Sequence, residues 1–402
     1  MVINMKRFKT TLAVVLTAVI AGGGAWCGHG FYIRSKYGEI ISKSIAVQST
    51  LERSYLYDYD QEKAADYAAM GITASLDDPY TTYYDKGSFK SYMDTGSGDF
   101  VGIGVVISKN DRNELIVLSV EDGSGAAEAG VRQDDVITAI DGVAYSGSQI
   151  NEAVAYVKGA GEKKDVADTP VKLSIRRNDT ENIEMEVFRK RIHTDSVSGK
   201  MIADGLGYIR ITKFNSVSES NQKDTADEFK AVLDDLTGQG MKKMILDLRS
   251  NPGGSESSVC RVADMMVPEG LIMYTEDKYG RRQEKKSDSN EINIPIAVLM
   301  NGESASASEL LAGALRDYGK AVLVGEKSFG KGIMQSVVDF WDGSGMSVTI
   351  ARYFTPKGTC VQDVGLLPDY EVSLSEEAKK IPLSQLSKEQ DSQLQKAIEV
   401  LG

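Results

Sequence analysis

The chain has 402 residues, more than one ordinary domain needs, and 42% of them are hydrophobic, which excludes an intrinsically disordered protein. Acidic residues outnumber basic ones by 58 to 46, and the net charge of −12 argues against a nucleic-acid binder. With two His and three Cys in the whole chain, a zinc site made of several such residues is not expected. Outside the apolar N-terminal segment, His193 is the only histidine that could act as a catalytic base. We therefore expect a serine nucleophile in this chain to be activated by a residue of another type.

The N-terminal segment carries the signals of a membrane address. Basic residues precede an uncharged run from Thr10 to Ile33, which as a helix would cross a hydrocarbon core of roughly 30 Å. We therefore expect residues 1–33 to be a signal anchor, with a cleavable signal peptide cut near Ala21–Ala25 as the alternative. Either interpretation places the body outside the cytoplasm, bound to the cell membrane or secreted. Cys260 and Cys360 could form a disulfide in that compartment.

The rest of the chain divides into four parts. Residues 34–90 carry amphipathic stripes and are expected to form a helical arm, either a spacer or a dimer contact. Residues 91–192 are expected to form a compact unit of short strands and helices in the order β-β-α-β-α-β-β. Residues 193–372 alternate apolar strands with helices, which indicates an α/β core. Residues 373–402 form a charged tail, expected to be helical over Ser387–Leu401.

The predicted strands, in chain order, are Phe100–Ile107, Leu115–Val120, Asp134–Gly142 (a strand that ends in a turn), Val171–Arg176, Ile183–Phe188, Leu206–Ile211, Met244–Leu248, Ile294–Met300, Ala321–Gly325 and Ile333–Phe340. The helices predicted among them are Ala126–Gly130, Ser148–Val157, Ser218–Leu236, Ser257–Met266 and Ser308–Tyr318.

A serine-rich motif, N-G-E-S-A-S-A-S-E, lies between a predicted buried strand and a helix. A serine at such a turn stands at the helix N-terminus, where backbone N–H groups and the helix dipole favour a developing oxyanion. The residues alone leave the nucleophile open among Ser304, Ser306 and Ser308. The competing interpretation is a helix capping box formed by Ser306 and Glu309.

Two glycine-rich motifs could complete a catalytic site. In S-F-G-K-G, Lys331 stands between two glycines at a turn where burial would lower its pKa and make it a neutral base. The alternative is a solvated loop lysine. The same region is similar to a P-loop and to an S-x-x-K acyl-enzyme motif. The companion residues of both motifs are missing, so neither kind of site is expected. Asp247–Gly254 is a strand that runs into a Pro-Gly-Gly turn, either a plain tight turn or an oxyanion donor.

Together these motifs resemble the carboxyl-terminal processing peptidases, also called tail-specific proteases, over roughly residues 40–400. The run G-V-R-Q-D-D-V-I-T-A-I-D-G resembles a PDZ domain. The shared runs are L-D-D-P-Y-T-T-Y-Y, F-V-G-I-G-V, D-L-R-S-N-P-G-G, N-G-E-S-A-S-A-S-E-L-L-A-G-A-L-R-D, G-E-K-S-F-G-K-G-I-M-Q and R-Y-F-T-P-K-G.

The resemblance implies an α+β and α/β multidomain chain. Its parts, in order, would be the membrane anchor (1–33), the helical region (34–90), a PDZ domain (91–192), a crotonase-like α/β serine protease core (193–372) and the helical tail (373–402).

The resemblance also assigns the catalytic roles. The middle serine, Ser306, would be the nucleophile, Lys331 its base, and Gln335 the residue that orients the lysine. An even offset of four along a strand agrees with Gln335 facing the lysine. The oxyanion hole would be formed by the backbone N–H groups of Gly253 and Ala307. No cofactor and no metal are implied.

The PDZ unit would select substrates with free, apolar, unstructured C-termini, by adding the peptide as a strand and holding its carboxylate. Arg176 and Arg177 are candidate contacts to the protease core, with plain surface arginines as the alternative. Helical arms at both ends suggest a homodimer. The competing class is a membrane PDZ scaffold that binds tails and cuts nothing, against which the complete Ser306, Lys331 and Gln335 set argues. The residues implied for carboxylate binding are Phe100, Val101, Gly102, Ile103 and Gly104.

Overall fold

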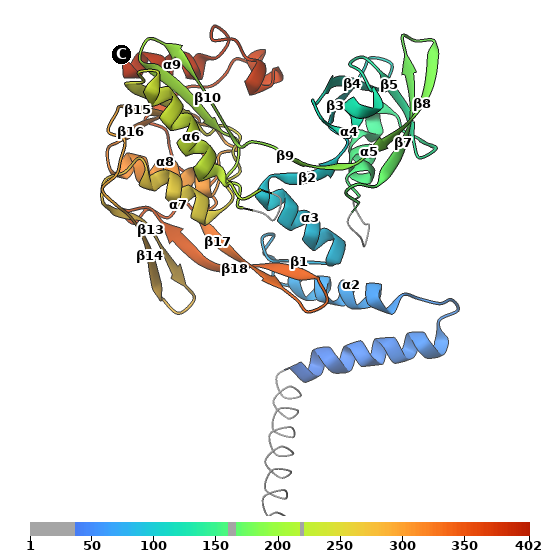
Figure 1. Ribbon diagram of the computed structural model, residues 1–402. Helices are drawn as coiled ribbons and strands as arrows, with labels where there is room; N and C mark the ends of the chain where they lie inside the picture. The colour runs from blue at the N-terminus through green and yellow to red at the C-terminus, as the bar shows by residue number, and fades with distance from the viewer. Residues whose placement is uncertain (1–36, 160–165, 218–220) are drawn as a thin grey trace, which may run out of the picture. The chain divides into compact units, whose positions relative to one another are not determined.

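The computed structural model describes residues 37–159, 166–217 and 221–402 (Figure 1). By its internal contacts the chain forms two units, Met1–Ser75 and Leu76–Gly402. The expected membrane segment, residues 1–33, lies outside the described residues. Within the described ranges, no helix is both long and apolar enough to cross a membrane.

The first unit is helical where it is described. Residues 37–54 form one helix. Helix α2 (Gln61–Ala74) follows, and its first turn is capped by the side chain of Asp60, which accepts the N–H of Lys63. Helix α2 buries none of its residues within the unit. Several large apolar side chains of the longer helix are exposed, among them Ile40, Ile41, Ile45 and Val47.

Part of the second unit is a small antiparallel barrel-like sheet with two helices. The strand order is β3-β4-β5-β7-β8, with β6 paired to β5, so β3 is an edge strand. The strands are β3 (Val105–Lys109), β4 (Leu115–Val120), β5 (Val136–Ile140), β6 (Val143–Ala144), β7 (Pro170–Arg177) and β8 (Glu181–Phe188). The helices are α4 (Gly125–Ala129) and α5 (Ile150–Val157). Alternating side chains such as Leu115, Val117, Leu173 and Ile175 fill its core.

The predicted single strand Phe100–Ile107 is wrong, because the chain turns at Gly104, whose φ is +76°. Its first part, β2 (Asp99–Gly102), pairs with β9 (Lys190–His193) in a separate two-stranded sheet. Its second part is β3, which pairs with β4. The segments that enter and leave the small sheet domain therefore run side by side.

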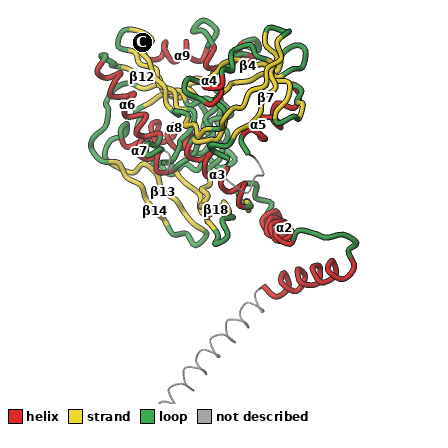
Figure 2. Tube along the Cα trace, turned by 45° about the vertical axis from the view of Figure 1, so that its right-hand side comes forward, coloured by secondary structure: helices red, strands yellow, loops and turns green. Residues whose placement is uncertain are grey.

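The main sheet has the order β10-β11-β12-β15-β16-β19, and every pair after β10–β11 is parallel. Its strands are β10 (Val197–Ala203), β11 (Leu206–Ile211), β12 (Lys243–Asp247), β15 (Ile296–Met300), β16 (Ala321–Gly325) and β19 (Tyr370–Glu371). Helices α6 (Thr225–Gly238), α7 (Glu256–Asp264) and α8 (Ala307–Asp317) cover one face, and α9 (Ser392–Leu401) covers the other. Figure 2 shows these helices in red and the strands in yellow.

Both faces of the main sheet are buried, as the apolar strands predicted. On β12, Met244 and Leu246 point into the core under the three helices, and Ile245 points into the core under α9. Two helix boundaries differ from the prediction. Helix α6 begins at Thr225, where Asp224 caps it, and not at Ser218. Helix α9 begins at Ser392 after the cap Asp391, and the chain before it forms short 3-10 turns.

A second sheet, whose strand β17 alone was predicted, lies beside the first. It has the order β1-β18-β13-β14, with β17 paired to β18. The strands are β1 (Thr82–Tyr84), β13 (Gly270–Asp277), β14 (Arg282–Ser287), β17 (Ile333–Asp339) and β18 (Gly345–Phe354), and α3 (Lys86–Ser97) follows β1. Strand β1 brings the segment just before it next to β17 and β18, which decides the surroundings of Lys331.

Candidate active site

One cavity of about 520 Å³ opens where the turn after β12, the start of α8 and the start of β17 meet. The turn and α8 follow neighbouring parallel strands, β12 and β15, at their carboxyl ends, the usual place for sites in such sheets. The cavity is lined by all five protease-core residues nominated from the sequence, Gly253, Ser306, Ala307, Lys331 and Gln335.

The three serines of the serine-rich motif have different surroundings. Ser304 is 2% exposed and its hydroxyl donates to Leu248 O at 2.9 Å. Ser308 is 0% exposed and its hydroxyl donates to Asn251 O at 2.9 Å. Ser306 is partly exposed and lines the cavity. Two of the three hydroxyls thus join the turn after β12 to α8, and the third is free to face a ligand.

The backbone at Ser306 is strained. Its φ is +56°, a conformation that a residue with a Cβ rarely adopts, and it immediately precedes α8. Strain at a strand-to-helix turn is a known way of presenting a nucleophile, because the side chain then projects away from the backbone. The N–H of Ala307, the first residue of α8, has no acceptor among the described residues.

Glu309 holds the backbone of Ser306 and Lys331 together. Its carboxylate is 1% exposed, and Oε2 accepts the N–H of Ser306 and the N–H of Lys331, both at 2.9 Å. Its Oε1 accepts the N–H of Gly330 at 2.8 Å and the hydroxyl of Ser328. The predicted capping box between Ser306 and Glu309 is therefore present, and the same carboxylate also anchors the lysine turn.

Tyr353 on β18 places its hydroxyl beside the backbone carbonyl oxygens of the same two residues. Its hydroxyl lies 2.8 Å from Ser306 O and 2.8 Å from Lys331 O, and its one proton can go to either. Burial raises the pKa of Tyr353, so the hydroxyl stays a donor. Glu309 thus binds the N–H groups of both residues, and Tyr353 donates to the carbonyl of one or the other. The sequence analysis assigned a functional role to neither.

Gly253 approaches Ser306 closely. At its φ of +100°, a Cβ would come within 2.8 Å of Ala305 O and of Ser306 Cβ, and within 2.9 Å of Ala307 N. Only glycine fits there. The N–H of Gly253 donates to Asn251 Oδ1 at 2.9 Å, so in this arrangement it is committed to that side chain.

The glycines around Lys331 let another loop pack against its turn, as the motif predicted. A Cβ on Gly332 would lie 2.4 Å from Gln362 N, and the Gly332 N–H donates to Gln362 Oε1 at 2.8 Å. Burial lowers the pKa of the Lys331 ammonium, and the charge of Asp78 opposes part of that effect. Lys331 Nζ lies 4.3 Å from the ring centroid of Tyr80.

Neither Ser306 Oγ nor Gln335 is hydrogen-bonded to Lys331 Nζ in the described part of the chain. Gln335 Nε2 donates instead to Thr349 Oγ1 at 3.3 Å. The cavity also holds a second lysine, Lys213, that the sequence analysis missed. Burial lowers the pKa of Lys213, and its Nζ donates to the carbonyl of Thr95 in α3.

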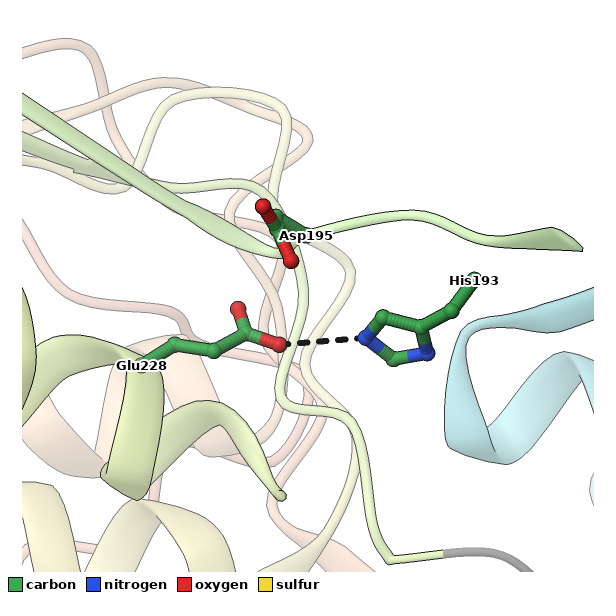
Figure 3. Close-up of side chains that lie close together, drawn as sticks. All are labelled: His193, Asp195 and Glu228. Carbon is green, nitrogen blue, oxygen red and sulfur yellow. Dashed lines mark hydrogen bonds and ion pairs between the residues drawn. The ribbon is translucent and has the colours of Figure 1, made fainter. Parts of the chain in front are cut away.

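His193 lies outside the residues that line this cavity, at the junction of β9 with the main sheet. Its Nδ1 is 2.9 Å from Asp99 Oδ1. Its Nε2 is 3.2 Å from Glu228 Oε1, the contact drawn in Figure 3. Burial opposes charging, but these two carboxylates outweigh it and raise the pKa of His193.

His193, Asp195 and Glu228 place ligand atoms within 4.8 Å of one another, a spacing that could hold a cation. The other oxygen of Glu228 accepts from the N–H and hydroxyl of Ser196 at 2.7 Å each. His193 and Glu228 already have hydrogen-bond and ion-pair partners within the protein.

The small sheet domain has an apolar groove of about 70 Å³ between its edge strand β3 and α5. Gly102, Ile103 and Gly104, three of the five residues implied for carboxylate binding, line it. Phe100 and Val101 belong to β2, where they pair with Ile192 and Arg191 of β9.

The prediction that Arg176 and Arg177 contact the protease core is wrong. Arg176 pairs with Glu114 at 2.6 Å, and Arg177 pairs with Asp135 at 2.8 Å, both within the small sheet domain. The Arg177–Asp135 pair is nearly buried, so it holds β7 to the turn before β5 and has a structural role. Cys260 and Cys360 are both free thiols.

A mixed-sheet core with an exposed serine on a strained turn, preceded by a PDZ-like sheet with an open edge, defines a PDZ-containing serine peptidase. Comparisons with known proteins agree. The sequence profile of Peptidase family S41 matches residues 205–372, and that of a PDZ domain matches residues 116–165. The carboxy-terminal processing protease CtpA of Bacillus subtilis (strain 168) is 34% identical over 384 residues, covering 93% of this chain and 79% of that protein.

A probable CtpA-like serine protease of Staphylococcus aureus (strain COL) is 34% identical over 337 residues, and the match spans 83% of this chain and 64% of that protein. Among solved structures, an S41 protease of Bacteroides fragilis NCTC 9343 shares the fold with a TM-score of 0.53 at 17% identity, over 86% of this chain and 92% of that one. The photosystem II D1 C-terminal processing protease is 29% identical, with a TM-score of 0.47, over 82% of this chain and 86% of that one. The chain belongs to peptidase family S41, the carboxyl-terminal processing serine proteases.

Proposed function

We propose that the chain is an endopeptidase that recognises free, apolar C-termini through its PDZ domain and cuts peptide bonds with Ser306 and Lys331. The observation that carries the proposal is that the same two side chains contact the backbone of both residues. Glu309 and Tyr353 bind the backbone of both, and both line one cavity. Ser306 is also the one member of its serine motif whose hydroxyl is not committed to a backbone carbonyl.

In the proposed reaction, neutral Lys331 takes the proton of Ser306 Oγ as the oxygen attacks the substrate carbonyl. The oxyanion is held by the N–H of Ala307, and by the N–H of Gly253 once its peptide leaves Asn251. The lysinium then protonates the leaving amine, and water hydrolyses the acyl-enzyme. Lys331 must first leave the ring of Tyr80, and we assign to Gln335 the role of orienting it near Ser306.

For substrate selection, the open edge of β3 and the apolar groove beside α5 favour strand addition of a peptide tail. Residues Gly102 to Gly104 would hold its carboxylate. We further propose that the PDZ domain extends over residues 91–192 and the protease core over 193–372, and that residues 1–33 anchor the chain with its body outside the cytoplasm. The exposed apolar face of residues 37–54 is consistent with a homodimer contact.

The test uses the full chain and its Ser306→Ala variant, each incubated with an unfolded protein that ends in an apolar free carboxylate. The same substrate amidated at its C-terminus is the matched control, and products are read by mass spectrometry. We expect the parent alone to cut, and to cut the amidated substrate more slowly. Equal cleavage by parent and Ser306→Ala would refute the nucleophile. Tail binding by both chains with no cleavage by either would favour a scaffold.

A further inference from the structure

The segment just before β1 reaches the side chain of Lys331. Tyr80 places its ring 4.3 Å from Lys331 Nζ, a cation–π distance. Asp78 lies near enough for its charge and that of the lysine to act on each other. Both groups favour the charged form of the amine, and burial favours the neutral form. The pKa of Lys331 therefore depends on two opposing effects, because burial lowers it and this segment raises it.

The segment is held in place by its own hydrogen bonds. Asp78 Oδ1 accepts the N–H of Tyr80 at 3.0 Å, and Asp78 Oδ2 accepts the hydroxyl of Thr81 at 2.7 Å. Thr81 Oγ1 in turn accepts the N–H of Thr349 on β18 at 3.0 Å. Thr349 Oγ1 accepts a hydrogen bond from the side-chain amide of Gln335. A continuous set of contacts thus runs from Gln335 to Asp78, around the lysine.

The charge of Asp78 is maintained in this position. Burial alone would raise its pKa, but the hydrogen bonds from Thr81, Tyr80 and Thr349, together with the charge of Lys331, outweigh that effect and lower it. Asp78 is therefore an anion at every pH at which a lysine could act as a base.

Other charged or titratable groups also face Lys331 or its cavity. Glu309 binds its backbone N–H from α8, and Tyr353 binds its carbonyl from β18. The other titratable residues in the cavity lining are Lys213, Glu256 and Tyr92. Of these carboxylates, Asp78 is the one whose charge acts on Lys331.

We propose that Asp78 and Tyr80 are positioning residues for the base: they hold the Lys331 side chain beside the cavity between turnovers and set the pH at which it loses its proton. The inference rests on the proposed function, in which Lys331 acts on Ser306. It assigns a role to the D-D-P-Y run, which had no role in the proposed chemistry.

The first test measures the pH dependence of kcat/KM for the full chain and three variants. Asp78→Asn keeps the oxygen that caps the turn and removes the charge, and Tyr80→Leu removes the ring. In both, the acidic limb should move to lower pH by roughly half a unit, because the charged lysine loses a stabilising neighbour. Tyr80→Phe keeps the ring and should leave the limb where it is. A lower plateau with an unmoved limb in Asp78→Asn and Tyr80→Leu would overturn the inference.

The second test does not need proteolysis. The full chain carrying Ser306→Ala is labelled by reductive ¹³C-methylation, and the Lys331 signal, assigned by its loss in Lys331→Arg, is titrated by NMR. Adding Asp78→Asn or Tyr80→Leu should lower the titration midpoint of Lys331 by a similar amount and leave that of Lys213 unchanged. An unmoved Lys331 midpoint overturns the inference. If the parent chain shows no Ser306-dependent cleavage, the proposed function fails, and this titration still decides the role of the segment.

Discussion

The backbone N–H of Lys331 donates to the carboxylate of Glu309 at 2.9 Å, across 22 positions of the chain. The accepting atom, Oε2, also holds the N–H of Ser306 at 2.9 Å. Because Glu309 is 1% exposed and belongs to α8, one rigid oxygen sets the spacing between the start of that helix and the lysine turn. The relative positions of the proposed nucleophile and base therefore depend on a residue that need not touch the substrate.

Replacing Glu309 by Gln should impair catalysis more than folding. The amide keeps the shape of the side chain but turns a donor toward N–H or O–H groups that need an acceptor. We expect kcat to fall by about 10²-fold with little change in KM, because misplacing the reacting groups by about an ångström has effects of that size. Steady-state kinetics measure this, and circular dichroism verifies the fold. Unchanged kcat in a folded Glu309→Gln variant would contradict the role of Glu309 in positioning Ser306 and Lys331.

Activity should fall in mild acid. Burial lowers the pKa of Lys331, and the base must be neutral, so activity rises with pH as the ammonium loses its proton and is lost as pH falls below that pKa. Lys331→Ala should lower kcat/KM by about 10³-fold. Lys213→Ala, the same change at the other cavity lysine, should lower kcat/KM by less than about tenfold and keep the pH profile. Full activity at pH 5 would argue against Lys331 as the base.

The C-terminal segment should stabilise the turn behind the active site. Arg249 is 1% exposed and pairs with Asp247 at 2.6 Å and with Asp391, the cap of α9, at 2.8 Å. Asp391→Ala leaves part of a buried guanidinium uncompensated and should lower the free energy of unfolding by about 3–5 kcal/mol. Urea denaturation of the full chain measures the change.

The control is Arg281→Ala, which removes the exposed partner of the ion pair with Asp277 and should lower the free energy of unfolding far less than Asp391→Ala does. Equal losses in the two variants would show that the buried network has no special weight.

His193 should make stability depend on pH. Its folded-state pKa is raised, so its contribution is complete below the ordinary value near 6.5 and disappears as pH rises through the folded-state value. His193→Gln should therefore lower the melting temperature most near pH 5.5, by an amount equivalent to about 1 kcal/mol, and least near pH 9. Calorimetry at several pH values gives the comparison. A deficit that is constant with pH would mean that folding does not shift the pKa of His193.

The amino-acid sequence alone named candidate residues that the structure brings to one cavity. Apolar runs such as Met244–Leu248 predicted the buried parallel strands, because a strand covered on both faces has no polar side to show. Motif spacing placed Gly253, Ser306 and Lys331 on three turns, and all three line one cavity. Local patterns served well wherever the physical cause lies within a few residues, as it does for a cap, a glycine turn or an apolar strand.

Long-range contacts decided the rest. The strand expected over Phe100–Ile107 divides between two sheets, because its pairing partners come from β9 and β4. Which serine is free depends on carbonyls of the turn after β12. The surroundings of Lys331 depend on Tyr80, far away in the chain. Hydrogen-bond partners and local charge are set by groups distant in sequence, which pattern and propensity do not encode, so only the tertiary structure brought Glu309, Tyr353 and Asp78 to the proposed base.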